Sequence, residues 1–322
     1  MIENSEWKAP FERVRAQRRR DVSPTFAEFA EQWVSTRRTA QGRPIRDSTA
    51  AGYRSVLAHH LLPILGDVRL TDMTAQHVRD WYAGLDQRKP RMASKAYGQL
   101  RAIMNSAVDD ELISASPVHI RGAGATAHRR KLEPATLNEL QVIAQSMPVR
   151  FQLMIWLASW CALRYGEIVE LRRSDIRVSP DAASALIRVR RGVVFLKGAK
   201  QVTAPKSDAG VRDVAMPPHL IPTLVDHVQR HAARGADGLL FPADGGGHLW
   251  SSVMQKHFRL ARERAGRPDL RFHDLRHTGA VLAAQQGATI ADLQARLGHS
   301  TAAAALLYQH TAAGRDQLIA QR

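Results

Sequence analysis

The chain has 322 residues, of which 44% are hydrophobic and 24% charged, so it is long enough for two ordinary globular domains. It carries 46 Lys and Arg against 30 Asp and Glu, a formal net charge of +16. This charge favours a polyanionic partner such as nucleic acid, although a basic protein from an arginine-rich proteome would show the same balance. A single cysteine, Cys161, excludes a disulfide framework and a cysteine-based zinc site. The N-terminus has no apolar signal segment and the apolar stretch 151–163 is too short to cross a bilayer, so we expect a cytoplasmic protein with no membrane partner.

The N-terminal part of the chain predicts a short arm followed by a helical domain. Residues 1–22 include a basic cluster at 18–20 and little apolar periodicity, which indicates a basic arm or linker. Beyond them apolar residues recur at helical spacing, Thr74 is placed to cap a helix, and a longer helix is expected over 93–108. We therefore expect an all-helical domain over 23–118, whose apolar stripes form its core.

A linker and a second domain follow. Residues 119–131 combine glycines, small residues and a basic run, which is typical of a connection between domains. Residues 132–322 alternate between helical periodicity and short strand-like segments. The expected elements are helices opened by Pro134, over 151–163, near Ile221, over 251–265 and from Asp274, strands over 186–189 and 193–196, and a hairpin of 202–206 and 211–216 around the turn 207–210. The predicted fold class is mainly α, a helical domain followed by a mixed α+β domain with one small antiparallel sheet.

Five short signatures follow one another in the second domain. They are Ala162-Leu163-Arg164-Tyr165-Gly166-Glu167, Pro205-Lys206-Ser207, His273-Asp274-Leu275-Arg276-His277, Leu297-Gly298-His299-Ser300 and Tyr308. Each is weak alone, but in this order and spacing they resemble the tyrosine recombinases, the family of phage integrases and chromosome-dimer resolvases. The resemblance runs from about residue 26 to the end of the chain and implies the catalytic domain of that family over 132–322.

The residue types suit attack on a DNA phosphodiester. Charge builds on the non-bridging oxygens during the reaction, and two guanidiniums, those of Arg164 and Arg276, can clamp these oxygens with bidentate bonds. His273 lies three residues before Arg276, so both can face one point from the first turn of a helix, whose N-terminus also favours an anion. His299 follows a helix that Thr289 should cap and Gly298 should end, which exposes its ring for donation to a phosphate oxygen.

The resemblance assigns the remaining roles. Tyr308 is the expected nucleophile, joined to the 3′-phosphate with release of a 5′-hydroxyl, and Lys206 on the predicted hairpin is the expected general acid for the leaving oxygen. Glu167 is expected to orient a catalytic group. Because protein cations do the electrostatic work, we expect no metal, no cofactor and no ATP.

Ordinary structural roles remain open for each of these residues. Arg164 can pair with Glu167 or Glu170 on a helix surface, Lys206 can be a turn lysine, and Tyr308 can be a core tyrosine. The first signature also departs from the family, because Ala162 stands where many members have glycine.

The resemblance implies site-specific recombination of the phage integration and excision type on double-stranded DNA core sites. Residues 1–131 carry 22 basic and 14 acidic side chains and residues 132–322 carry 24 and 16, so each half has a net +8 and both are expected to contact DNA. We expect a tetramer on DNA, accessory DNA-bending or directionality factors, and a short form of the family without an N-terminal arm-binding domain. The alternatives are a resolvase-type recombinase, an enzyme similar to type IB topoisomerases, and a catalytically idle DNA-binding protein on the same fold.

Overall fold

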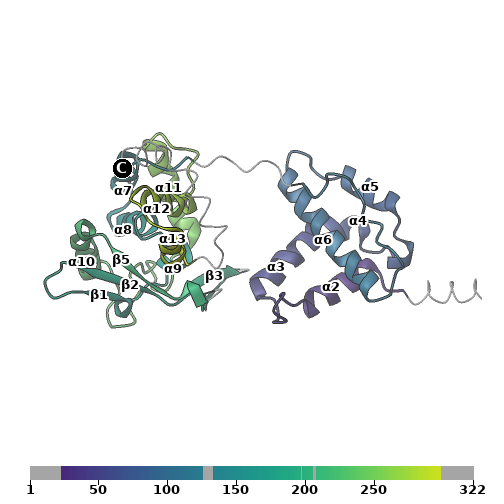
Figure 1. Ribbon diagram of the computed structural model, residues 1–322, viewed down its shortest axis with the longest axis horizontal. Coiled ribbons are helices and arrows are strands. Elements are labelled where there is room, and N and C mark those ends of the chain that lie inside the picture. The colour runs from purple at the N-terminus through teal and green to yellow at the C-terminus, as the bar shows by residue number, and fades with distance from the viewer. Residues whose placement is uncertain (1–22, 126–132, 197, 206–207, 299–322) are drawn as a thin grey trace, which may run out of the picture. The chain divides into compact units, whose positions relative to one another are not determined.

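The structure, a computed structural model, describes residues 23–125, 133–196, 198–205 and 208–298 (Figure 1). The chain divides into two compact units, residues 1–130 and 131–322. Each unit has its own core of buried apolar side chains.

The first unit is helical throughout its described part. Its core gathers large side chains such as Phe26, Trp81 and Leu100, all fully buried. Thr25 caps the first helix with Glu28. Thr74 caps a later helix, as the sequence predicted. The helices are α2 (Phe26–Thr36), α3 (Asp47–Val56), the π-helix η1 (Leu57–Leu61), α4 (Leu62–Leu65), the 3-10 turn η2 (Leu70–Asp72), α5 (Ala75–Ala83) and α6 (Pro90–Asp109).

The segment from α3 through η1 to α4 was not predicted as helix. Pro63 has no N–H to donate to the carbonyl of residue 59, and its ring crowds the preceding turn, so the α-helical ladder cannot run through unchanged. The chain widens into the π-helical turn just before this proline.

Residues around and after 118 also pack on the first unit. Val118 and Ala123 are buried in its core. The Tyr97 hydroxyl accepts a hydrogen bond from the Ile120 amide at 2.8 Å, and the Ser94 hydroxyl donates to the Gly124 carbonyl at 3.2 Å. The beginning of the expected linker is therefore packed on the helical unit.

The second unit surrounds the apolar helix α8 (Val149–Ser159), which packs against α7 (Leu137–Ser146), α10 (Ile221–Arg230) and α12 (Phe272–Gln285) (Figure 1). Its other helices are α9 (Tyr165–Ile168), α11 (Ser251–Arg264), α13 (Ile290–Leu297) and the 3-10 turns η3 (Arg173–Asp175), η4 (Asp208–Gly210) and η5 (Pro218–Leu220). Several boundaries differ from the prediction. The first helix starts after its cap Thr136 rather than at Pro134, α8 covers 149–159 rather than 151–163, and α12 begins at Phe272 rather than at Asp274.

Two small antiparallel sheets replace the single sheet that was predicted. One has the order β1-β2-β5, built from β1 (Ile176–Val178), β2 (Ala185–Val189) and β5 (Arg212–Met216). The other pairs β3 (Gly192–Leu196) with β4 (Ala199–Thr203).

The predicted hairpin across 207–210 is therefore wrong. β5 pairs with β2, with Ile187 opposite Val214, because both strands present a buried apolar face. β4 has no fully buried position and pairs with its neighbour β3 across a turn at Gly198. The segment between β4 and β5 connects two different sheets.

One backbone contact between α8 and α12 is unusually close. A Cβ atom added to Gly279 of α12 would lie 1.8 Å from the carbonyl oxygen of Ser159 at the end of α8, so the position admits only glycine. Three residues after Ser159, Ala162 adopts a left-handed conformation with φ 53°. The two features fix the path of the chain from α8 towards Arg164. None of the helices in the described ranges has the length and apolar character needed to span a bilayer.

Candidate active site

Arg164 precedes the short helix α9 and is held by Glu167. Its backbone amide donates to Glu167 Oε2 at 2.9 Å and its Nη1 donates to Oε1 at 2.8 Å. The Glu167 side chain is 8% exposed, whereas the Arg164 side chain is 41% exposed. Arg164 thus forms one of the ion pairs that the sequence left open, yet a large part of its side chain stays exposed.

Arg276 and His273 come from the start of α12, as their spacing predicted. Arg276 is buried, and its guanidinium donates to the carbonyls of Ala162 and Leu297. His273, the second residue of the helix, is more exposed and its ring meets that of His277 edge-on, with centroids 5.0 Å apart. Desolvation, His277 and Arg276 lower the pKa of His273 to about 4, so the ring is neutral at pH 7 and each nitrogen can serve a different partner.

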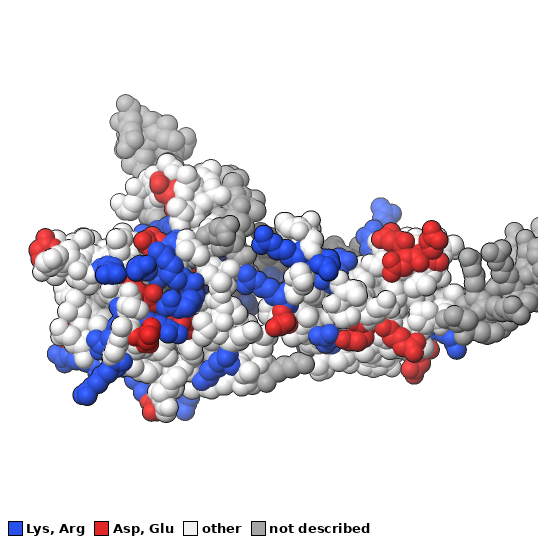
Figure 2. Space-filling view, turned by 90° about the horizontal axis from the view of Figure 1, so that it is seen from below, with Lys and Arg blue, Asp and Glu red and all other residues white. Residues whose placement is uncertain are grey.

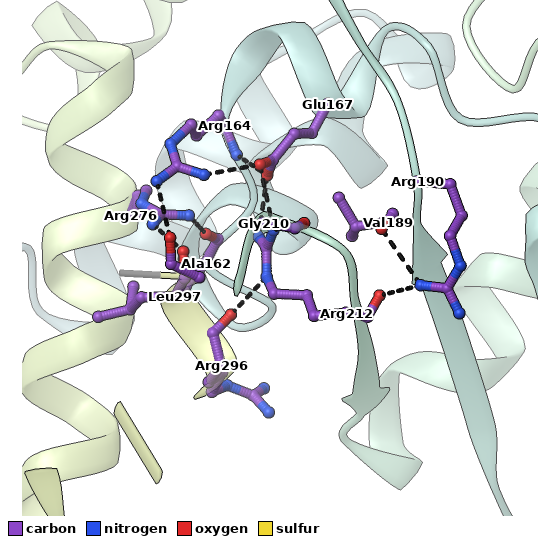
Figure 3. Close-up of polar contacts among 11 residues, drawn as sticks. Ala162, Arg164, Glu167, Val189, Arg190, Gly210, Arg212, Arg276, Arg296 and Leu297 are labelled. Atoms are coloured by element: carbon purple, nitrogen blue, oxygen red, sulfur yellow. Dashed lines mark hydrogen bonds and ion pairs between the residues drawn. The ribbon is translucent and has the colours of Figure 1, made fainter. Parts of the chain in front are cut away.

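The two arginines meet at the end of α13. Arg164 Nη2 donates to the carbonyl of Gly298 at 3.4 Å, and Arg276 Nη2 donates to the carbonyl of the preceding residue, Leu297 (Figure 3). Gly298 ends the helix in a left-handed conformation with φ 62°, and Thr289 caps its start with Asp292, so both predicted caps are confirmed. Two guanidiniums from distant parts of the sequence therefore converge on consecutive carbonyl groups.

A third arginine, Arg212 on β5, lies at this junction and was missed in the sequence analysis. Its side chain is 5% exposed. It donates to Glu167 Oε1 at 3.1 Å and Oε2 at 2.9 Å, to the Gly210 carbonyl at 3.1 Å and to the Arg296 carbonyl at 2.8 Å (Figure 3). The strand pattern contained a signal for it, because Arg212 shares the inward face of β5 with Val214 and Met216.

Glu167 is consequently an ionised carboxylate between two guanidiniums. Burial alone would raise its pKa, but the hydrogen bonds and charge of Arg212, together with the charge of Arg164, outweigh burial and lower the pKa to about 2. The carboxylate stays charged throughout the physiological pH range, so its hold on both arginines does not depend on pH there.

Three of the predicted site residues, Lys206, His299 and Tyr308, lie outside the described residues. His299 directly follows Gly298, whose carbonyl accepts from Arg164. Lys206 directly follows Pro205, which lies against Gly210, since a Cβ atom on that glycine would be 2.4 Å from the proline Cβ. The described residues therefore bring together Arg164, Arg276, His273 and Glu167 of the predicted set.

The second unit has a basic face. Figure 2 shows Lys and Arg side chains gathered over this unit on the face in view, with fewer acidic ones between them. Some arginines of the unit are paired, as at the buried Glu170, which accepts from Arg172 and Arg191. Within the described part of the chain, no group of three His, Cys, Asp or Glu side chains is placed to hold a metal ion. An anionic ligand suits this surface better than a cationic one.

Comparison with known proteins gives consistent matches for both units. Residues 130–315 match the model of the phage integrase family, and residues 25–85 match the phage integrase N-terminal SAM-like domain. The chain is 49% identical over 297 residues to a prophage phiRv2 integrase of Mycobacterium tuberculosis, which covers 92% of this chain and 76% of that protein.

Two solved structures share the fold. The Tn1549 transposon integrase in complex with a circular intermediate DNA superposes with a TM-score of 0.74 at 16% identity, covering 93% of this chain and all of that one. A lambda integrase tetramer bound to a Holliday junction gives a TM-score of 0.65 at 20% identity, covering 92% of this chain and 80% of that one.

Proposed function

The chain belongs to the phage integrase family and is a tyrosine recombinase, an enzyme of site-specific recombination, and from this premise we propose that it performs integration and excision of the phage type through a 3′-phosphotyrosyl intermediate at Tyr308. The relative that is 49% identical to this chain is itself named a prophage integrase. The comparisons favour this role over the resolvase, topoisomerase and idle DNA-binding alternatives, because the relatives of highest identity among those compared are integrases.

The convergence of Arg164 and Arg276 on the Leu297–Gly298 turn is the observation that carries the proposal. Both guanidiniums are oriented by protein carbonyls before any substrate arrives. In the reaction they bind the non-bridging oxygens of the scissile phosphate, where negative charge develops in the transition state. Preorganised donors at such a position commonly supply a large part of the rate enhancement.

The histidines and Glu167 complete the phosphate site. His273 is neutral and sits at the N-terminal turn of α12, so its ring N–H can donate to a phosphate oxygen while the helix terminus favours the negative charge. His299 is proposed to donate to a further oxygen, since it follows the turn that both arginines contact. Glu167 orients Arg164 and takes no proton, because its pKa is far below 7.

Lys206 and Tyr308 are proposed to move the protons and form the covalent bond. The Tyr308 phenol gives its proton to solvent water and its oxygen attacks phosphorus, and the bond to the leaving 5′-oxygen breaks as that oxygen takes a proton from Lys206. The 3′-phosphotyrosyl bond keeps the energy of the phosphodiester. A 5′-hydroxyl from the partner strand then gives its proton back to Lys206 and attacks the same phosphorus, and the released Tyr308 oxygen takes a proton from water, so no ATP is consumed.

We propose double-stranded DNA core sites as the substrate and a tetramer as the active assembly. The solved structures with this fold include integrases bound to DNA and a tetramer bound to a Holliday junction, and a net charge of +16 suits a DNA ligand. In this proposal residues 1–22 form a basic arm or linker, 23–118 the core-site binding domain, 119–131 a linker whose first residues pack on that domain, and 132–322 the catalytic domain. Accessory DNA-bending or directionality factors and a cytoplasmic location belong to the same proposal.

A covalent trapping experiment tests the nucleophile. The substrate is a duplex carrying the inverted repeat that the parent protein cuts, found by searching the DNA beside its gene, with a nick near the cleavage point so that the cleaved strand escapes. The parent should form a protein–DNA adduct, and Tyr308→Phe should form none while binding DNA with nearly unchanged affinity. Tyr165→Phe is the matched control, because the hydroxyl of Tyr165 donates to the Leu249 carbonyl beside the site, and it should form the adduct. An equal adduct yield from Tyr308→Phe would overturn the assignment.

A further inference from the structure

Arg212 makes more contacts within the site than a surface arginine does. Its guanidinium forms four hydrogen bonds, two to the Glu167 carboxylate and one each to the carbonyls of Gly210 and Arg296. With the side chain 5% exposed and its donors engaged in this way, it is not available to a DNA phosphate. Any effect on the reaction must therefore pass through the groups that it holds.

The first of these groups is Glu167, which binds Arg164. Each carboxylate oxygen accepts one bond from Arg212 and one from Arg164, at distances between 2.8 and 3.1 Å. A carboxylate fixed on both oxygens by the planar fork of a guanidinium cannot rotate freely. Arg212 therefore determines the plane in which Glu167 presents its oxygens to Arg164.

The second group is the turn at the end of α13. Arg212 Nε holds the carbonyl of Arg296, and the next two carbonyls along the chain, those of Leu297 and Gly298, accept from Arg276 and Arg164. Gly298 also packs on the Arg212 side chain, since a Cβ atom there would lie 3.2 Å from Nη1 and 3.3 Å from Cδ. Arg212 therefore contacts the turn through the Arg296 carbonyl and Gly298. The other two arginines bind the carbonyls of Leu297 and Gly298.

Stability alone does not account for this arrangement. Burying an ion pair costs desolvation, and a well-packed apolar pair of similar volume often stabilises a fold as much or more. An apolar pair could not orient a carboxylate towards Arg164. We propose that Arg212 is a positioning residue for the phosphate site: it fixes Glu167, and through it Arg164, and it supports the Leu297–Gly298 turn where Arg164 and Arg276 meet. The inference rests on the proposed function of those two arginines.

Arg212→Lys is the informative substitution, because it keeps the charge but cannot bind both carboxylate oxygens and two carbonyls. Arg190→Lys is the matched control. Arg190 lies beside the same strand, pairs with Asp213 at 2.6 Å and donates to the backbone carbonyl of Arg212 at 2.8 Å, but it contacts neither Glu167 nor the α13 turn (Figure 3). Two quantities are measured on the nicked duplex, the dissociation constant by fluorescence anisotropy and the single-turnover rate of adduct formation at saturating protein.

We expect Arg212→Lys to slow adduct formation roughly 10–100-fold, the scale of a small displacement of reacting groups, with the dissociation constant within about threefold of the parent. Arg190→Lys should stay within about threefold in both quantities. Glu167→Gln should reproduce the rate loss, and it serves as the second probe if Arg212→Lys does not fold. The double variant should be no more than about threefold slower than the slower single variant, because both changes act on the same contact.

Three results would overturn the inference: a parent-like rate for Arg212→Lys or Glu167→Gln, a rate loss that is seen only below saturating protein, or losses that multiply in the double variant. Failure of the proposed function itself is distinguishable, because then the parent and Arg190→Lys would form no adduct either.

Discussion

Replacing Gly298 by alanine tests the α13 turn most directly. The residue has φ 62°, where an L-residue with a Cβ atom costs roughly 1–2 kcal/mol. The added Cβ would also lie 2.8 Å from the Ala209 carbonyl oxygen and 3.2 Å from Arg212 Nη1, and overpacking of this kind costs about 1–3 kcal/mol. The free energy of unfolding should fall by about 2–5 kcal/mol, and the cleavage rate by roughly 10²-fold, because the carbonyls that orient Arg164 and Arg276 shift.

Gly266→Ala separates the two contributions. Gly266 follows α11 with φ 70°, and an added Cβ there would meet no atom within 4 Å. This variant should lose only the roughly 1–2 kcal/mol of backbone strain and keep the parent cleavage rate. Urea unfolding followed by tryptophan fluorescence and single-turnover cleavage measure the two quantities. Equal stability losses in the two variants, or an unchanged rate in Gly298→Ala, would refute the packing of this turn on Arg212.

Three further outcomes follow from the described geometry. Arg164→Lys and Arg276→Lys keep their charge but lose the planar donor pair, so each should slow single-turnover cleavage roughly 10²–10³-fold; rates within a few-fold of the parent would exclude the clamp. Ala162→Gly relieves the backbone strain at φ 53° but removes a buried methyl. In urea unfolding, its free energy of unfolding should therefore change by less than about 1 kcal/mol, whereas Ala158→Gly inside α8 should lose about 2 kcal/mol. Equal losses would contradict the strain at Ala162. Burial lowers the pKa of His227 to about 4, so the unfolded chain takes up this proton first and stability should fall as pH drops from 6.5 towards 4, by at most about 1.4 kcal/mol per pH unit. His227→Gln should flatten that slope in urea titrations, and an unchanged slope would assign it to other groups.

Structural features that depend on a few adjacent residues were predictable from the sequence. Thr289, Asp292 and Gly298 delimit α13 through contacts within that one segment, and the structure confirms each of them. The spacing of His273 and Arg276 likewise places both on the first turns of one helix. Local hydrogen bonding and helical geometry decide such features, so no knowledge of the rest of the chain is needed.

Features that depend on distant partners were missed. The pairing of β5 with β2 instead of β4 is decided by which strands share an apolar face, and a short turn-like segment between β4 and β5 suggested the wrong neighbour. Arg212 was overlooked because an arginine is usually a surface residue, and only the position of Glu167 in the folded chain explains its burial. The π-helical turn before Pro63 was not predicted either, although Leu57, Leu61 and Leu65 recur at helical spacing.

The contact between Gly279 and the Ser159 carbonyl has a consequence for how the enzyme can be regulated. Gly279 lies one helical turn after Arg276, and Ser159 lies five residues before Arg164, so this contact joins the two segments that carry the arginines. Two helices in direct backbone contact must separate before one can shift along the other, because no flexible side chain lies between them at that point. We therefore expect the spacing between the two backbone segments to be the same with and without DNA. A regulated change of activity would then have to act on other parts of the site than the path of these two segments.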